Sequence, residues 1–365
     1  MFDIEKKNIT IGFMPLTDSA PVIVAHEMGF FEQWGLNVSL TKQNSWATLR
    51  DKLHVGVIDA AQMLAPMPIA SNLGLYGQKS AVISPMILSR NGNGITLSTT
   101  LYEKIVSQHS NKNNNKNNDI SMPFAASILQ PEIEQRKKAG DKLSFAVVAP
   151  YSCHYYQLIE WLKKSDIALS DINLLIVPPS DMVPSMQSGD LDGFCVGSPW
   201  NAKAVREGVG ITGVTSSDFW PDSPEKVLGL LSDWQIKHPN TTLALMSALY
   251  DACQWLENIP NRFEAARLLS RAKYLDTHID VIAPSLLGSC LTLNGTTPRK
   301  VPNYLQFSLL DDPEFNTPAH HYGEKIADLM QACQQISPQQ KADLNMKAIY
   351  REDLYQTAIS HIKQR

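Results

Sequence analysis

The chain has 365 residues, of which 44% are hydrophobic and 19% are charged, a mixture typical of a globular protein with room for two domains. The net charge of −4 arises from acids and bases mixed along the sequence, without the basic face that nucleic-acid binding requires. Apolar runs are too short to span a bilayer, so we expect neither direct nucleic-acid binding nor membrane insertion.

The N-terminal residues and the cysteines bear on the compartment. The first strand is predicted at residues 9–14, and no charged-then-apolar export segment precedes it. The cysteines are five in number, widely scattered and without a C-x-x-C pair, which fits reduced thiols better than a disulfide framework. These features predict a cytoplasmic location. A periplasmic location is the alternative if an export signal has been removed.

A β-α-β-α-β pattern occurs twice in the first half of the chain. The first copy has predicted strands at 9–14 and 36–40, predicted helices at 25–31 and 46–54, and a third strand after Gly56. The second copy has predicted strands at 143–149 and 173–177, predicted helices at 153–164 and 181–187, and a third strand after Gly189. In both copies a helix stops at the glycine of Gly-x-[Ile/Leu]-Asp-[Ala/Gly]. The repeat predicts an α/β fold with two lobes, each a mostly parallel sheet flanked by helices.

The domain boundaries follow from this layout. We predict lobe one at residues 1–96 and 227–365, with C-terminal helices covering it, and lobe two at residues 97–226. Two crossing strands between the lobes, near 95–98 and at 227–232, would form a hinge suited to closure around a ligand. Residues 107–119, SQHSNKNNNKNND, contain no apolar side chain and are predicted to form a solvated insertion loop.

Three loop-to-helix junctions are expected to face the cleft between the lobes. They are the segments 17–19, 44–46 and 152–154. Ligands of open α/β sheets lie beyond the carboxyl ends of the strands, and helix starts favour anions. Ser45 and Ser152 are therefore candidate ligand contacts, although serine at such a position often simply caps its helix.

The side chains near these junctions suit a small planar anion. Trp46 offers an indole N–H and a flat wall, His154 offers ring donors, and Lys226 offers a countercharge. Asn91 and Asn93 add amide donors beside the first crossing. Taken singly, each has an ordinary interpretation as a core, capping or solvated residue. The hypothesis is that they converge.

No motif for catalysis is present. The chain lacks G-x-S-x-G, a Walker P-loop and H-E-x-x-H, and we predict neither an enzyme nor a bound metal or cofactor.

Several longer segments carry a family resemblance. They are GFMPLTDSAP at 12–21, HEMGFF at 26–31, SWATLRDK at 45–52, MLAPMP at 63–68, DGFCVGSPWN at 192–201 and WPDSPEKVLG at 220–229. Together they resemble the nitrate- and bicarbonate-binding components of ABC transporters. The resemblance implies a periplasmic-binding-protein-like fold of type II, with an oxyanion held between the lobes.

The resemblance also implies which residues form the pocket. Nitrate binders of this family use a Trp, an amide, a His and a Lys, which fall on Trp46, Asn91, His154 and Lys226. Glutamine is expected at the amide position, so Asn91 is a departure, and Asn93 is the substitute; Gly197 is a further candidate. Bicarbonate binders are expected to carry an acid in place of the lysine, together with a metal. Lys226 therefore favours nitrate or nitrite, although a one-residue shift onto Glu225 would reverse that inference.

Two biological roles fit the resemblance. A cytoplasmic branch of the family senses nitrate or nitrite and pairs with an RNA-binding antitermination regulator, and the start of this chain resembles that branch. The alternative role is the extracytoplasmic receptor of an ABC importer, with a permease as its partner. Thiamin pyrimidine-precursor synthases share the broad fold, but the cysteine-rich motif expected of them is missing here.

Overall fold

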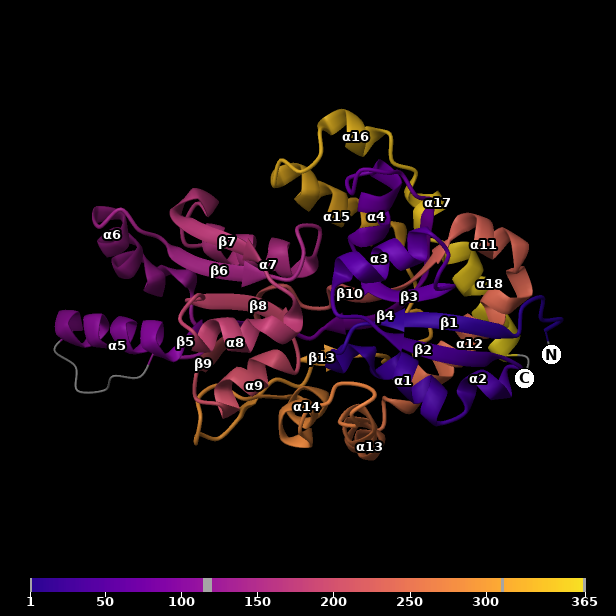
Figure 1. The fold of residues 1–365 in the computed structure, drawn as a ribbon, viewed down its shortest axis with the longest axis horizontal. Coiled ribbons are helices and arrows are strands. Elements are labelled where there is room, and N and C mark those ends of the chain that lie inside the picture. The colour runs from indigo at the N-terminus through magenta and orange to yellow at the C-terminus, as the bar shows by residue number, and fades with distance from the viewer. Residues whose placement is uncertain (1, 114–119, 310–311, 364–365) are drawn as a thin grey trace.

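The computed structural model describes residues 2–113, 120–309 and 312–363, and these form two lobes that lie side by side (Figure 1). Each lobe is built on one β-sheet with helices packed against it. The first sheet has six strands in the order β13-β4-β10-β3-β1-β2, and the second has five in the order β7-β6-β8-β5-β9.

The repeated sequence pattern forms the parallel part of each sheet. In the first sheet, β1 (Asn8–Phe13) lies between and parallel to β2 (Asn37–Lys42) and β3 (Ala60–Leu64). In the second sheet, β6 (Leu143–Val147) lies in the same way between β7 (Ile172–Ile176) and β8 (Gly193–Gly197). The predicted duplication is therefore present in the strand order of both sheets.

The remaining strands run antiparallel, so both sheets are mixed rather than mostly parallel. In the first sheet, β10 (Pro224–Leu231) lies between β3 and β4 (Val82–Asn91), and the short β13 (Leu305–Gln306) pairs with β4. In the second sheet, β5 (Asn93–Ser98) lies between β8 and β9 (Gly210–Thr215). β5 and β10 are the first strands after each crossing, and each enters its sheet beside the third strand of the repeat.

The two crossings lie a few residues earlier than the predicted boundaries. β5 belongs wholly to the second sheet, so the first crossing is at Gly92, and β10 begins at Pro224. The backbone turns sharply at both places, because Asn91, Gly92 and Asp222 all have positive φ, at 60°, 96° and 58°. The first of these turns agrees with the sequence, because the Asn-Gly pairs of residues 91–94 are a turn signal.

Helices of the first half cover both sheets. They are α1 (Ala20–Glu27), α2 (Phe30–Gln33), α3 (Trp46–His54), α4 (Met67–Leu73), α5 (Thr99–Asn113), α6 (Gln130–Lys138), α7 (Cys153–Lys163), α8 (Met182–Gln187), α9 (Trp200–Arg206) and α10 (Ser216–Phe219). The helix α5 runs through the first half of the predicted insertion loop. Its buried Leu101 and Ile105 anchor it, and with neither Gly nor Pro in 107–113 the helix continues. Residues 114–119 of that prediction lie outside the described residues.

The C-terminal part adds further helices, mostly around lobe one (Figure 1). They are α11 (Ser232–Lys237), α12 (Pro239–Trp255), α13 (Ile259–Leu269), α14 (Ile279–Leu286), α15 (His320–Ala332), α16 (Pro338–Ala342), α17 (Met346–Ile349) and α18 (Glu352–Lys363). The long helix α12 packs on α1, α2 and α18, while α14 also contacts α9 of lobe two. A small hairpin of β11 (Ser289–Cys290) and β12 (Arg299–Lys300) follows α14.

The lobes are closed against each other. One hydrophobic cluster contains residues from both sides, including Leu16 and Trp46 of lobe one and Tyr156 and Phe194 of lobe two. A backbone hydrogen bond of 2.8 Å joins Thr17 N–H to the carbonyl of Ser198 across the interface. The polar groups described next are therefore shielded from solvent.

Candidate anion-binding site

A buried cluster of polar side chains lies where the two lobes meet. It receives residues from the 3₁₀ turn after β1 (Thr17–Ser19), from the starts of α3 and α7, and from the first residues of β5 and β10. The turn and the two helix starts lie beyond the carboxyl ends of parallel strands, and β5 and β10 are the strands that follow the two crossings. The fold therefore brings together segments that are more than 200 residues apart.

The centre of the cluster is an ion-paired lysine. Lys226 Nζ lies 2.8 Å from Asp18 Oδ2 and 2.8 Å from Glu225 Oε1. All three side chains are buried. The ammonium also lies 5.6 Å from the centroid of the Trp46 ring, a distance at which a cation is attracted to an aromatic face.

Glu225 and Lys226 are neighbours on a strand, yet both reach this centre. Successive side chains of a regular strand point to opposite faces. The pairing of β10 with β4 shifts between Pro224 and Lys226 and again between Lys226 and Val227. Such irregularities re-aim side chains, which accounts for the close contact of the two charged groups.

Burial alters the charge states of these groups. It raises the pKa of the Asp18 and Glu225 carboxyls above their ordinary values, although the positive charge of Lys226 opposes the shift. Burial also disfavours the charge of Lys226, but the two carboxyls outweigh it and raise the pKa of the lysine. Full ionisation would leave a net charge of −1 from one ammonium and two carboxylates.

Histidine and amide side chains surround the ion pair. His154 Nε2 lies 3.7 Å from Glu225 Oε1, and burial together with the charge of Lys226 lowers the pKa of His154 well below its usual value. Asn93 Nδ2 donates to Glu225 Oε2 at 2.7 Å and to Gln157 Oε1 at 2.8 Å. Gln62 donates to Asp18 at 2.8 Å. The lowered pKa of His154 favours the neutral ring, which carries one N–H donor.

Several buried polar atoms of this cluster have no hydrogen-bond partner among the described residues. They are Thr17 Oγ1, Trp46 Nε1, Asn93 Oδ1, Gln157 Nε2, and both ring nitrogens of His154. Buried polar groups are normally paired, since an unpaired one costs about 1–3 kcal/mol. Four different segments supply these atoms. The Trp46 ring faces Lys226, and His154 and Asn93 lie next to Glu225. The arrangement offers donors and a positive charge to a small polar ligand.

The structure brings most of the predicted site residues together. Trp46, His154, Lys226 and Asn93 belong to the cluster. Gly197 adjoins it, because a Cβ atom there would lie 3.4 Å from Asn93 Oδ1 and 3.5 Å from Asp18 Oδ2. A Cβ atom at position 197 would therefore be in van der Waals contact with the site.

Asn91 lies outside the cluster, and the prediction for it needs correcting. Its Nδ2 donates to the carbonyl of Asn303 at 2.9 Å and lies 3.3 Å from Gln306 Oε1. The positive φ of Asn91 and Gly92 turns the chain at this point, so Asn91 and Asn93 have different neighbours. The amide near Lys226 is that of Asn93.

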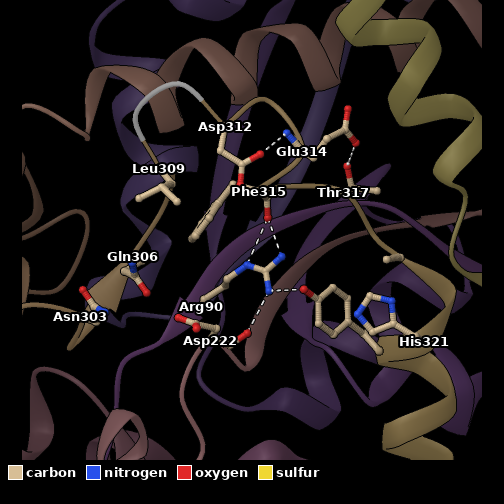
Figure 2. Close-up of a pocket in the computed structure, with 12 residues that line it drawn as sticks. Arg90, Asp222, Asn303, Gln306, Leu309, Asp312, Glu314, Phe315, Thr317 and His321 are labelled. Carbon is tan, nitrogen blue, oxygen red and sulfur yellow. Dashed lines mark hydrogen bonds between the residues drawn. The ribbon is translucent and has the colours of Figure 1, made fainter.

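The partners of Asn91, Asn303 and Gln306, line a separate cavity of about 620 Å³ (Figure 2). Within it, Arg90 donates to the carbonyls of Asp222 at 2.9 Å and Phe315 at 2.6 Å. Arg90 precedes the first crossing, and Asp222 precedes the second. The guanidinium thus connects both crossings to the C-terminal segment, and Asn91 contacts residues of the same segment.

Ser45 and Ser152 act as helix caps. Each hydroxyl accepts a hydrogen bond of 3.1 Å from a backbone N–H of the first turn, Thr48 N for Ser45 and Tyr155 N for Ser152. Ser152 also donates to the carbonyl of Ala149. The capping interpretation therefore accounts for both serines without a ligand.

Removing one cap gives a test. We expect Ser45→Ala to lower the free energy of unfolding by about 1 kcal/mol, because Thr48 N–H loses its partner. Anion affinity, measured by isothermal titration calorimetry, should not change. If the free energy of anion binding fell by more than the free energy of unfolding, Ser45 would be one of the residues that contact the ligand.

Sequence reasoning missed several members of the cluster, among them Gln62, which it did not consider. Asp18 was considered only for the backbone of its loop, and Glu225 only as an alternative alignment of Lys226. Gln157 lies three residues after His154, a spacing that places both on one face of α7, so a signal for it was available.

No group of three or more His, Cys, Asp or Glu side chains suited to a metal occurs among the residues the structure describes. Within the same residues, no helix has the length and apolarity needed to cross a bilayer.

Comparison with known proteins agrees with this architecture. Among solved structures, the periplasmic nitrate-binding protein NrtA from Synechocystis PCC 6803 superimposes with a TM-score of 0.87 and 26% identity, covering 99% of this chain and 90% of that one. Among curated proteins, the nitrate/nitrite binding protein NrtA of Synechococcus elongatus is 36% identical over 294 residues, 78% of this chain and 62% of that protein. The bicarbonate transport ATP-binding protein CmpC of Synechocystis sp. is 37% identical over 282 residues, 76% of this chain and 39% of that protein.

These similarities confirm the predicted two-lobed fold and the resemblance to nitrate- and bicarbonate-binding proteins. The chain spans less than two thirds of the length of both curated relatives. The model of the NMT1-like family matches residues 3–270, and the chain belongs to that family.

Proposed function

We propose that this chain binds a small inorganic oxyanion, nitrate or nitrite, between its two lobes, and that it catalyses no reaction. The observation that carries the proposal is the buried ammonium of Lys226, 5.6 Å from the centroid of the Trp46 ring, in a cluster where Trp46 Nε1 and Gln157 Nε2 have no hydrogen-bond partner among the described residues. An ion with oxygens at its corners would satisfy these donors together, whereas a cation would leave them unpaired. The Trp46 ring adds a flat wall suited to a planar ion.

Bicarbonate is the second candidate, and a specific observation favours it. Bicarbonate carries one hydroxyl that can donate a hydrogen bond, whereas nitrate and nitrite carry none. Asp18 and Glu225 place carboxyl oxygens, which accept hydrogen bonds, beside the same lysine. Relatives named for nitrate and for bicarbonate resemble this chain to a similar degree, so overall identity does not separate the two ions.

The proposed biological role is that of the extracytoplasmic receptor of an anion importer, working with a permease and an ATP-binding subunit. Support comes from relatives whose names describe a periplasmic nitrate-binding protein and an ATP-binding subunit for nitrate import. The alternative of a cytoplasmic sensor that holds an antitermination regulator has no such support among these relatives. Detection of the chain in the periplasmic fraction of its native cell would support the receptor role, and its recovery with a regulator from the cytoplasm would contradict it.

A panel of anions tests the binding proposal. We expect nitrate or nitrite to raise the melting temperature, because a ligand that binds only the folded state stabilises it by RT ln(1 + [L]/Kd). At a concentration of about 100 times Kd the gain is about 2.7 kcal/mol. Differential scanning fluorimetry with nitrate, nitrite, bicarbonate, sulfate and chloride makes the measurement. A larger shift with bicarbonate would select the second candidate, and no shift with any of them would contradict the proposal.

A further inference from the structure

Gln157 is a buried amide whose two ends have different surroundings. Its Oε1 accepts a hydrogen bond from Asn93 Nδ2 at 2.8 Å, while its Nε2 has no partner among the described residues. It lies one turn after His154 on the same face of α7. The side chain is held at one end and free to donate at the other.

The direction of this amide follows from the charge of Glu225. The same Asn93 nitrogen also donates to Glu225 Oε2, at 2.7 Å. An ionised carboxylate only accepts hydrogen bonds, so the Asn93 atom between the two residues must be its NH₂ group. The Gln157 atom that meets this NH₂ must then be the carbonyl oxygen. The two hydrogen bonds from Asn93, to Glu225 and to Gln157, therefore leave Gln157 Nε2 as the unpaired atom of the Gln157 amide.

Asn93 cannot serve the ligand in the same way. Both hydrogens of its NH₂ group are used, one by Glu225 and one by Gln157. Its remaining polar atom, Oδ1, is an acceptor, which an anion does not bind. The amide predicted from sequence at Asn91 or Asn93 is thus absent from the ligand side at both positions.

We propose that Gln157 is the amide that contacts the bound anion through its Nε2–H, and that Asn93 is a positioning residue that orients Gln157. This inference rests on the proposed function. Under this inference, α7 carries two residues that contact the ligand, His154 and Gln157, and so contributes to the specificity for an oxygen-bearing anion.

The side-chain amide of Gln157 can be observed directly by NMR. In protein labelled with ¹⁵N-glutamine, saturating nitrate should shift the Gln157 NH₂ resonances and slow their exchange with water. The signal is assigned by its absence in Gln157→Met. Unchanged Gln157 resonances while calorimetry shows nitrate binding would overturn the inference and leave the proposed function intact. No nitrate binding at all would instead contradict the proposed function.

Substitutions give the second readout. Gln157→Met removes the donor at similar volume and should weaken nitrate binding by about 10- to 100-fold, the usual effect of losing a hydrogen bond to a charged group. Gln157→Glu places a negative charge there and should weaken it further. The matched control is Gln187→Met on the exposed end of α8, which should leave the affinity unchanged. Native affinity in both Gln157 variants would overturn the inference.

Discussion

Replacing Lys226 with methionine is expected to weaken anion binding by at least about 100-fold and to destabilise the folded chain by about 3–5 kcal/mol near neutral pH. The binding loss follows because the ammonium is the countercharge of the proposed site. The stability loss follows because Lys226 pairs with two buried carboxyls, Asp18 and Glu225, at 2.8 Å each. Removing one partner of a buried ion pair leaves the other charge uncompensated.

The stability deficit of Lys226→Met should depend on pH. Burial already raises the pKa of Asp18 and of Glu225, and loss of the lysine removes the positive charge that opposes this shift. A carboxyl whose pKa is higher in the folded than in the unfolded state favours folding below its unfolded pKa of about 4. That contribution disappears as pH rises through the folded pKa. Denaturant unfolding should therefore show a small deficit near pH 4 and the full deficit near pH 8.

Two further variants separate binding from folding. Lys52→Met on α3 changes a lysine whose ammonium donates to Gln43, and it should leave both affinity and stability nearly unchanged. The double variant Glu225→Gln with Lys226→Met removes one of the two stranded carboxyls. It should recover part of the stability without recovering the affinity. Native nitrate affinity in Lys226→Met would place the countercharge elsewhere.

The parallel core of each lobe could be predicted from sequence because its signals are local. Helix stops at Gly56 and Gly189 and apolar strands at regular spacing define β1 to β3 and β6 to β8 without knowledge of distant contacts. The antiparallel insertion of β5 and β10 depends on pairing between segments more than 100 residues apart. Nothing in the sequence near Gly92 or Pro224 reports that pairing.

The same distinction applies to the site. Trp46 and His154 follow predictable helix starts, and Lys226 lies close to the start of an apolar strand, so their convergence could be inferred from the fold. The inward position of Glu225 depends on irregular pairing of β10 with β4, and strand alternation alone would place Glu225 and Lys226 on opposite faces. Asn91 was misplaced because the turn at Gly92 decides which asparagine reaches the cluster. Nearby backbone geometry, rather than residue type, determined these outcomes.

The second large effect is a dependence of anion affinity on pH. With Asp18, Glu225 and Lys226 all ionised the site carries −1, and a bound monoanion would bring it to −2 in surroundings without solvent. Burying uncompensated charge is costly, so the complex should hold one proton more, on a carboxyl or on His154. The pKa values of both carboxyls are raised, which favours protonation of a carboxyl. The pKa of His154 is lowered, which disfavours protonation of the histidine. A carboxyl is therefore the expected proton acceptor, and Asp18 takes this part because Glu225 must stay ionised to accept from Asn93.

The sign of the effect follows from this linkage. Below the pKa of that carboxyl in the empty site, the proton is already present and Kd for nitrate should be constant. Above it, the proton must be taken up on binding, and Kd should rise about tenfold for each pH unit. Nitrate itself stays ionised throughout, so the slope reports the protein. Titration calorimetry at about pH 8 in Hepes and in Tris, whose ionisation enthalpies differ, should show uptake of about one proton.

Glu225→Gln is the informative variant for this slope. The neutral amide removes one negative charge and leaves Asp18 paired with Lys226, so nitrate should bind without proton uptake and with a Kd nearly independent of pH. Glu160→Gln, on the outer part of α7, is the matched control and should keep the native slope. Equal heats in the two buffers and a flat pH profile for the native chain would mean that the site takes up no proton with the anion, which would contradict the predicted linkage.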